Sequence, residues 1–209
     1  MQRFSDFLNE LRNPKEIGQF RKSVKDIKNV DTRDNSWQYT LPDLMKKHGF
    51  SRLGSGKYAS VFGNPKYSYV LKVFMKDAAY FKWLKFVQEN QSNPYIPKVK
   101  GKVIKITPIF YAIRLEKLTP YSGNAPSTRK FMTDYAQWKK NPSYQSNDQN
   151  IQDILDYFAK FKSLLDLHGE NMMMRNNQLV VIDPFYNWFG KKEPGKYMID
   201  PDEVDPSIF

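Results

Sequence analysis

The chain has 209 residues, which is enough for one ordinary domain or two small lobes. Its content of 40% hydrophobic and 15% aromatic residues can build a core and argues against wholesale disorder. The sequence holds no Cys and only two His, His48 and His168, which excludes disulfide frameworks, thiol nucleophiles and polyhistidine metal sites.

The net charge of +11 predicts an anionic partner, such as nucleic acid, an anionic surface or a phosphorylated ligand. Residues 51–121 carry 13 basic and 3 acidic side chains (+10), residues 1–50 carry 10 and 7 (+3), and residues 122–209 carry 10 and 12 (−2). The excess therefore lies in the middle third. Neither a signal peptide nor a membrane helix is predicted, so we expect a cytoplasmic protein without membrane contact.

The N-terminal forty residues are predicted to be a helical extension. Apolar residues recur at three- and four-residue steps over 3–29, with a break at Asn13-Pro14, which predicts two short amphipathic helices. The polar stretch 31–36 is typical of a linker. A further helix is expected over Leu41 to His48, ending at Gly49.

Short extended segments dominate the part from Phe50 to Pro120. Strands are predicted over 58–62, 69–74, 99–106 and 109–115, and one helix over 77–91. Beyond Pro120 the pattern is mostly helical. Helices are predicted over 128–139 and 150–165, followed by strands 172–174 and 179–182 joined by a turn at Asn176-Asn177.

Two features of the middle part are compatible with nucleotide binding. Small residues at Gly54, Gly56 and Ala59 let backbone N–H groups approach a polyphosphate, and Val61 would cover a purine ring; an ordinary hairpin is the alternative. Lys72 lies in an apolar strand. A buried ammonium needs a negative partner, which phosphate would provide, whereas a Lys on the solvent face needs none.

Three polar residues near the end of the chain complete an ordered set. Asp166 could accept or orient a hydroxyl proton, while Asn171, five residues later, and Asp183 could hold a divalent cation. For an Asp taken alone, capping a helix or stabilising a turn is the more common role. The order of Gly-rich turn, Lys, Asp, Asn and Asp is the one that phosphoryl transfer from ATP requires.

On these residues the chain resembles the protein-kinase-like superfamily over about residues 50–190. The resemblance implies a two-lobed α+β fold with a small, mostly antiparallel β N-lobe of five strands and one helix. A minimal helical C-lobe would follow, with ATP in the cleft. The expected boundaries are 1–40 for the helical extension, 41–118 for the N-lobe and 119–209 for the truncated C-lobe.

The same resemblance implies a role for each site residue. It assigns ATP binding to the Gly-rich loop, the phosphate-binding Lys, the hinge and the pocket floor. It assigns metal binding to two residues and catalysis to Asp166 with Lys72. Glu89 is the expected carboxylate partner of Lys72, since Asp77 lies too close to the strand. The ATP-binding set is Gly54, Gly56, Ala59, Val61, Lys72, Glu116, Leu118 and Met173, and the Mg²⁺ ligands are Asn171 and Asp183.

A closer resemblance is to the early serine/threonine protein kinase of short-tailed lytic phages. It rests on the segments 41–56 and 166–173, on Asp183-Pro184 and on Ile199–Glu203. It implies phosphorylation of host proteins in the bacterial cytoplasm, with RNA polymerase or RNA-processing enzymes among the targets. The basic C-terminal extension of longer members, which shuts off host transcription, is expected to be absent after Phe209.

The sequence departs from the kinase pattern at several positions. Leu165 replaces the Arg of regulated kinases, and only the 26 residues 184–209 follow Asp183, too few for the usual activation segment. His168 stands where protein kinases usually have Lys. One interpretation is a structural histidine that bonds the backbone of the turn, and the other is a resemblance to the Asp-Leu-His motif of small-molecule phosphotransferases. Four lysines lie at nearly alternate positions along one predicted strand. This spacing is typical of a solvated strand edge or of a docking surface for an acidic partner. They are Lys98, Lys100, Lys102 and Lys105.

Three functions remain open on the sequence alone. The first is an active protein kinase that uses Mg²⁺ and ATP. The second is a kinase-fold binding module or pseudokinase that inhibits a host complex through its basic N-lobe. A small-molecule kinase ranks third, and direct nucleic acid binding is left undecided.

Overall fold

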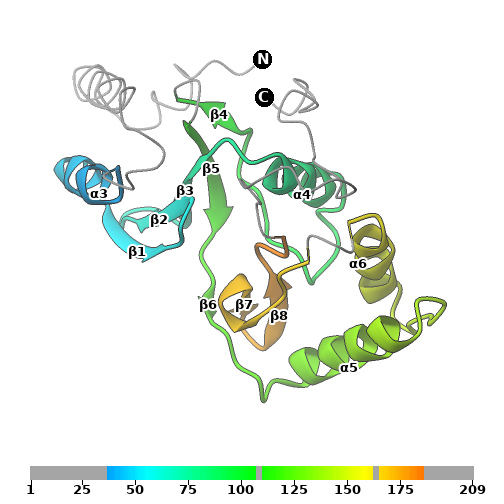
Figure 1. The fold of residues 1–209 in the computed structure, drawn as a ribbon. Coiled ribbons are helices and arrows are strands. Elements are labelled where there is room, and N and C mark those ends of the chain that lie inside the picture. Colours follow the sequence, from blue (N-terminus) through cyan, green and yellow to red (C-terminus); the bar gives the residue numbers. More distant parts are fainter. Residues whose placement is uncertain (1–36, 107–109, 162–164, 186–209) are drawn as a thin grey trace. The chain divides into compact units, whose positions relative to one another are not determined.

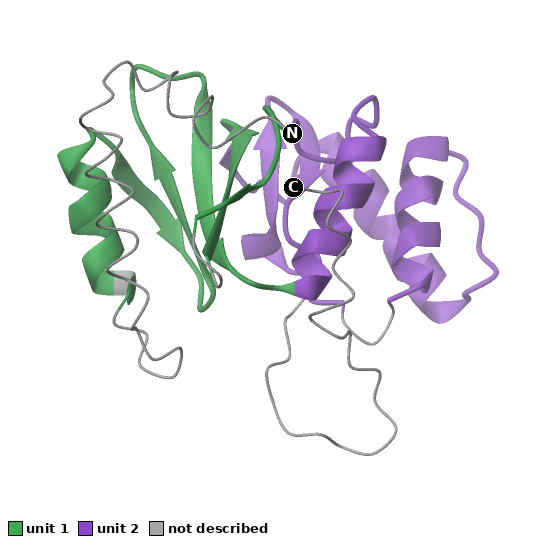
Figure 2. Cartoon of the chain, turned by 90° about the horizontal axis from the view of Figure 1, so that it is seen from above, with its two compact units in different colours: residues 1–77, 99–117, 205–209 green, residues 78–98, 118–204 purple. Residues whose placement is uncertain are grey.

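The structure is a computed structural model that describes residues 37–106, 110–161 and 165–185. These residues form an α+β fold (Figure 1). The chain divides into two compact units, coloured green and purple in Figure 2. Unit 1 takes its described residues from 37–77 and 99–117, and unit 2 from 78–98 and 118–185. The helices predicted over 3–29 and the linker 31–36 lie outside the described residues.

Unit 1 is built on a five-stranded antiparallel sheet with the strand order β1-β2-β3-β5-β4. Five strands is the number that the kinase resemblance implies. The order is sequential except at β4, which lies beyond β5 because the chain leaves the sheet after β3. The strands are β1 (Ser51–Ser55), β2 (Ala59–Gly63), β3 (Tyr69–Met75), β4 (Ile104–Lys105) and β5 (Phe110–Glu116).

Helix α3 (Trp37–Lys47) covers one face of this sheet. Its apolar residues Trp37, Leu41 and Met45 are almost completely buried and form one core with Leu71 and Val73 of β3. The rings of Trp37 and Phe110 lie 5.4 Å apart. The helix ends at Lys47, and Gly49 just beyond it has a φ of 76° that is readily accessible only to glycine.

Unit 2 combines three helices with a three-stranded sheet ordered β6-β7-β8. The β7–β8 hairpin turns at Asn176, which has a φ of 57°, as the Asn-Asn pair predicts. Among the described residues, no helix is long and apolar enough to cross a membrane. The elements are α4 (Ala78–Glu89), β6 (Thr119–Pro120), α5 (Pro126–Lys140), α6 (Gln149–Ala159), a 3₁₀ turn η3 (Gly169–Asn171), β7 (Met172–Arg175) and β8 (Gln178–Val181).

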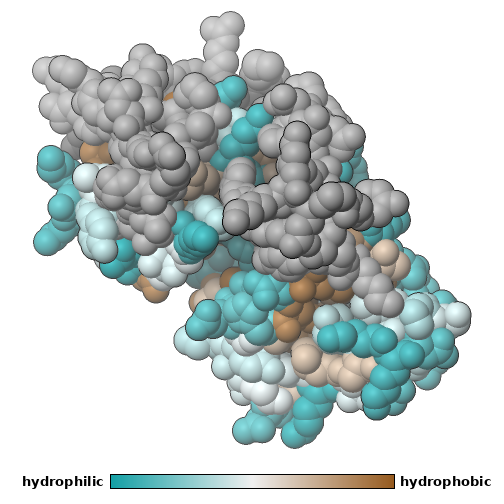
Figure 3. Space-filling view, viewed as in Figure 1, coloured by the Kyte–Doolittle hydropathy of each residue, from teal (hydrophilic) through white to brown (hydrophobic). Residues whose placement is uncertain are grey.

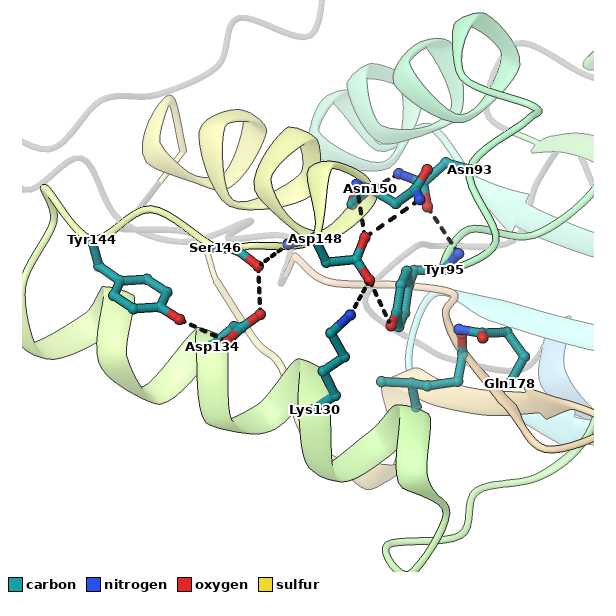
Figure 4. A network of polar contacts seen from close by, with 10 residues as sticks. Asn93, Tyr95, Lys130, Asp134, Tyr144, Ser146, Asp148, Asn150 and Gln178 are labelled. Atoms are coloured by element: carbon teal, nitrogen blue, oxygen red, sulfur yellow. Dashed lines mark hydrogen bonds and ion pairs between the residues drawn. The ribbon is translucent and has the colours of Figure 1, made fainter.

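A polar network joins α5 to the start of α6 (Figure 4). Asp148 caps α6 by accepting a 3.0 Å hydrogen bond from the backbone N–H of Asn150, and Lys130 of α5 contacts its other oxygen at 2.6 Å. Asp134 of α5 accepts a 2.5 Å hydrogen bond from Ser146 Oγ. These bonds fix the loop between the two helices, because two of them tie a loop or cap residue to α5 and the third caps α6.

Several predicted elements have different bounds in the structure. The predicted strand 99–106 forms ladder pairs only at β4, apart from one bridge at Val99, because Gly101 has a φ of 98° that interrupts extended backbone. The predicted helix 150–165 ends at Ala159. The sequence pattern does not indicate strands β1 and β6, and α3 begins at Trp37, four residues before the predicted start at Leu41.

Candidate active site

Lys72 lies in the middle of the sheet of unit 1. It pairs with Val61 of β2 on one side and with Ile113 of β5 on the other. Because side chains alternate along a strand, Lys72 projects from the face opposite to that of Leu71 and Val73, which pack on α3. Its side chain is 7% exposed, so the alternative of a solvent-facing lysine is wrong.

The glycine-rich segment spans the end of β1, which includes Gly54, and the turn into β2. The backbone N–H of Gly56 donates a 2.9 Å hydrogen bond to the carbonyl of Ala59, which closes a hairpin. A Cβ atom added at Gly54 or Gly56 would meet nothing within 4 Å, and neither residue has a positive φ. Within this fold, then, neither packing nor backbone strain requires glycine here. The open space above the backbone is what close approach of a ligand would need.

In unit 2, Asp166 and Asn171 are bound to each other through the turn that separates them. Asn171 Nδ2 donates a 2.6 Å hydrogen bond to the backbone carbonyl of Asp166, and Asn171 N donates to the His168 carbonyl at 3.0 Å. Asp166 N donates to the carbonyl of Pro184 at 2.8 Å. This use of the amide nitrogen makes Asn171 Oδ1 the side-chain atom that could ligate a cation.

Asp183 is held beside the same turn. The backbone N–H groups of Ile182 and Asp183 lie 3.0 and 3.4 Å from the carbonyl oxygen of Asn171. Asp183 follows β8 and begins no described helix, and the cap of η3 is His168. The helix-capping alternative is therefore wrong for both Asp166 and Asp183. Unit 2 thus brings together Asp166, Asn171 and Asp183, three polar residues that the sequence separates by up to 17 positions.

This donor set suits Mg²⁺ that is shared with a phosphate. Mg²⁺ prefers oxygen ligands and usually keeps several waters or substrate oxygens, so one carboxylate and one amide oxygen are sufficient. Among the described residues, no group of three or more His, Cys, Asp or Glu side chains could hold a metal ion by itself. The residues present therefore fit a cation that arrives with a nucleotide better than a permanent metal centre.

The remaining predicted site residues lie at the ends or faces of short elements. Glu116 ends β5, and Leu118 lies between β5 and β6. Met173 is half-buried, whereas its neighbours Met172 and Met174 are buried on the other face of β7. Glu89 is the exposed last residue of α4. Its charge, after the larger effect of burial, raises the pKa of Tyr157.

One residue that holds the Asp183 segment in place has no functional signal in the sequence. The indole Nε1–H of Trp83, in α4, donates a 3.2 Å hydrogen bond to the carbonyl of Ile182. The Trp83 ring also lies edge-on to Phe185, 6.2 Å away. Phe185 is two residues after Asp183 in the sequence. Only a long-range contact identifies Trp83, because its helical spacing indicates no more than a core position.

The lysines of the predicted docking surface do not all have the same environment. Lys98 Nζ donates to the backbone carbonyls of Gln91 and Asn93, just after α4, so it satisfies the carbonyls that follow the helix. Lys100, Lys102 and Lys105 are exposed and belong to unit 1. On the face drawn in Figure 3, hydrophilic residues cover most of the described surface. Docking by the three exposed lysines remains a prediction.

The comparisons with known proteins agree with the residues gathered in unit 2. The sequence matches the family described as Bacteriophage T7 protein kinase 0.7 over residues 21–208. A search of curated proteins finds no match. The matched segment covers most of the chain and contains every predicted site residue, and the family name indicates a phage protein kinase. The chain therefore belongs to the bacteriophage T7 protein kinase family.

Proposed function

We propose that this chain is a protein kinase with a two-lobed, kinase-like fold that transfers the γ-phosphate of ATP to Ser or Thr hydroxyls. The observation that carries the proposal is the grouping of Asp166, Asn171 and Asp183 around one turn. It supplies a proton acceptor and two cation ligands, which are the protein groups that phosphoryl transfer uses. The buried Lys72 of the sheet supplies a positive charge for the phosphates.

Asp166 is the residue that would act on the protein substrate. Its carboxylate accepts the proton of the attacking hydroxyl while the hydroxyl oxygen forms a bond to phosphorus and the bond to the ADP oxygen breaks. Asn171 Oδ1 and the Asp183 carboxylate would hold Mg²⁺. When bound, the cation neutralises the phosphate charge. Lys72 orients the phosphate oxygens through charge-assisted hydrogen bonds.

Host proteins are the proposed substrates, with RNA polymerase or RNA-processing enzymes as first candidates. This part of the proposal rests on the family to which the chain belongs. The basic balance of residues 51–121 supports an acidic partner near the exposed lysines of unit 1. Activity inside the host cytoplasm follows from the same proposal.

The test is transfer of radiolabelled phosphate from ATP into a bacterial lysate. Wild type is compared with Asp166→Ala, and Asp43→Ala, an exposed carboxylate of α3, is the matched control. We expect labelled host proteins with wild type and Asp43→Ala and none with Asp166→Ala. Equal labelling by all three proteins would overturn the role of Asp166, and no labelling by wild type would overturn the kinase.

Binding of ATP gives a second, independent readout. A ligand that binds only the native state, at a concentration one hundred times its Kd, raises the free energy of unfolding by about 2.7 kcal/mol. Mg²⁺ and ATP together should therefore raise the melting temperature. A protein that labels nothing and shows no shift with ATP would instead be a binding module. In that case the protein would inhibit a host complex by binding it through the exposed lysines of unit 1.

A further inference from the structure

His168 contacts both the backbone of the turn and the carboxylate of Asp166. Its Nδ1 lies 3.3 Å from the backbone nitrogen of Glu170, which donates to it. Its Nε2 lies 3.5 Å from Asp166 Oδ2. The two side chains are 47% and 42% exposed, so the contact forms at the surface of the turn, where a substrate can reach it.

Two neighbouring donors and one carboxylate bear on which ring nitrogen carries the proton. A backbone N–H can only donate, so the bond to Glu170 forms when Nδ1 is the unprotonated nitrogen of the neutral ring. The proton is then on Nε2, the nitrogen that faces the Asp166 carboxylate. Asn171 Nδ2, which lies 3.1 Å from Nε2, can also only donate, so each tautomer sets one pair of N–H groups against each other, at Glu170 or at Asn171. The negative charge of Asp166, whose Oδ2 lies 3.5 Å from Nε2, decides between them because it favours the proton on Nε2.

We propose that His168 is a positioning residue for Asp166, and this rests on the proposed function. The Nε2–H group holds Oδ2, so that Oδ1 is the oxygen left to accept the proton of the substrate hydroxyl. His168 keeps its own proton throughout, because the proton of the substrate moves only to Asp166. The imidazole thus orients Asp166, as a second polar group commonly orients a catalytic base.

Two substitutions separate this role from a purely structural one. In His168→Asn, the side-chain oxygen can replace Nδ1 as the acceptor for Glu170 but cannot reach Asp166. In His168→Gln, the amide nitrogen can replace Nε2 toward Asp166, while the acceptor at the position of Nδ1 is lost. A structural histidine is therefore better replaced by Asn, and a positioning histidine by Gln.

The first experiment measures kcat, KM for ATP and the melting temperature of the full chain and of both variants. We expect His168→Asn to lower kcat about 10- to 100-fold with KM for ATP unchanged, because misorientation of a reacting group has effects of this size. His168→Gln should keep kcat within about threefold of wild type by the same argument, even if its melting temperature falls. A His168→Asn protein with the kcat of wild type would overturn the proposal.

The second experiment does not depend on activity. The ¹⁵N chemical shifts of the ring identify the tautomer, and the loss of one signal in His168→Asn assigns it, since the chain has only one other histidine. We expect Nε2–H in wild type and a shift of this signal in Asp166→Asn. A ring protonated on Nδ1 would overturn the positioning role. A wild type that transfers no phosphate would instead refute the proposed function, whichever tautomer is found.

Discussion

Val61 and Lys72 are directly opposed across the ladder of β2 and β3, on the face of the sheet that does not pack on α3. The pairing follows from the register that aligns Ala59 with Phe74 and Gly63 with Val70. Slippage by one residue would turn Lys72 toward the core of Leu71 and Val73, because neighbouring residues of a strand face opposite sides. The apolar pattern of β3 thus fixes the side on which the ammonium lies.

Replacement of Lys72 by Met should abolish most of the kinase activity and preserve the fold. Met keeps the unbranched apolar stem and removes the charge, so the strand can still pack. We expect kcat/KM to fall by about 10²–10³, the usual effect of removing one preorganised group from a developing charge. Lys46→Ala, an exposed residue of α3, is the control and should leave the activity unchanged. Equal activity of Lys72→Met and wild type would remove Lys72 from the site.

Replacement of Asn171 by Ala should change the dependence of activity on Mg²⁺. The variant loses the 2.6 Å bond to the Asp166 carbonyl and the amide oxygen assigned to the cation. We expect a free energy of unfolding lower by about 1 kcal/mol and a higher Mg²⁺ concentration for half-maximal activity. Asn177→Ala, in the exposed turn of the β7–β8 hairpin, should show neither effect. An unchanged Mg²⁺ titration would exclude Asn171 as a ligand.

Replacement of Trp83 by Phe should test how the segment before Asp183 is held. Phe retains an aromatic ring for contacts with Phe158 and Phe185 but has no N–H for the carbonyl of Ile182. Loss of one hydrogen bond predicts a decrease of about 1 kcal/mol in the free energy of unfolding, measured in urea. We also expect a lower kcat. The control is Tyr157→Phe, in the same aromatic cluster, and a kcat equally low in both variants would contradict the specific role of the indole.

The parts of the fold that the sequence predicts well are those that depend on neighbouring residues. The turn at Asn176 and the stripe of Ile151, Ile154 and Phe158 on α6 are set by local conformation and by helical spacing. The turn between Asp166 and Asn171 also depends on neighbouring residues. Its two ends are five residues apart, so their hydrogen bond needs no distant segment.

The features that the sequence could not predict depend on long-range contacts. Trp83 and Ile182 are 99 residues apart, and neither position carries a signal for their hydrogen bond. Strand β1 is exposed along its whole length and contains an irregularity between Arg52 and Gly54, so it lacks the alternation that identifies a strand. Lys98 belongs to the alternating row of lysines in the sequence, yet its ammonium group donates a hydrogen bond to a backbone carbonyl just after α4.

Acid should weaken unit 2 through Asp148, and substitution of this residue should show it. Burial alone raises the pKa of Asp148, but the hydrogen bond and charge of Lys130 and the bonds from Asn150 outweigh it and lower the pKa. Because the pKa is lower in the folded state, the stabilisation is complete above the ordinary Asp pKa of about 3.9 and is lost as the pH falls through the folded value. We expect Asp148→Ala to cost about 1 kcal/mol at pH 7, the usual value of a lost N-cap.

Urea unfolding of wild type and Asp148→Ala at pH 7 and at pH 3 measures this effect. The two proteins should differ clearly at pH 7 and less at pH 3, because protonation weakens the same interactions in wild type that the substitution removes. Asp43→Ala, an exposed residue of α3, should track wild type at both values. A difference between wild type and Asp148→Ala that is as large at pH 3 as at pH 7 would mean that the charge of Asp148 does not stabilise the junction of α5 and α6.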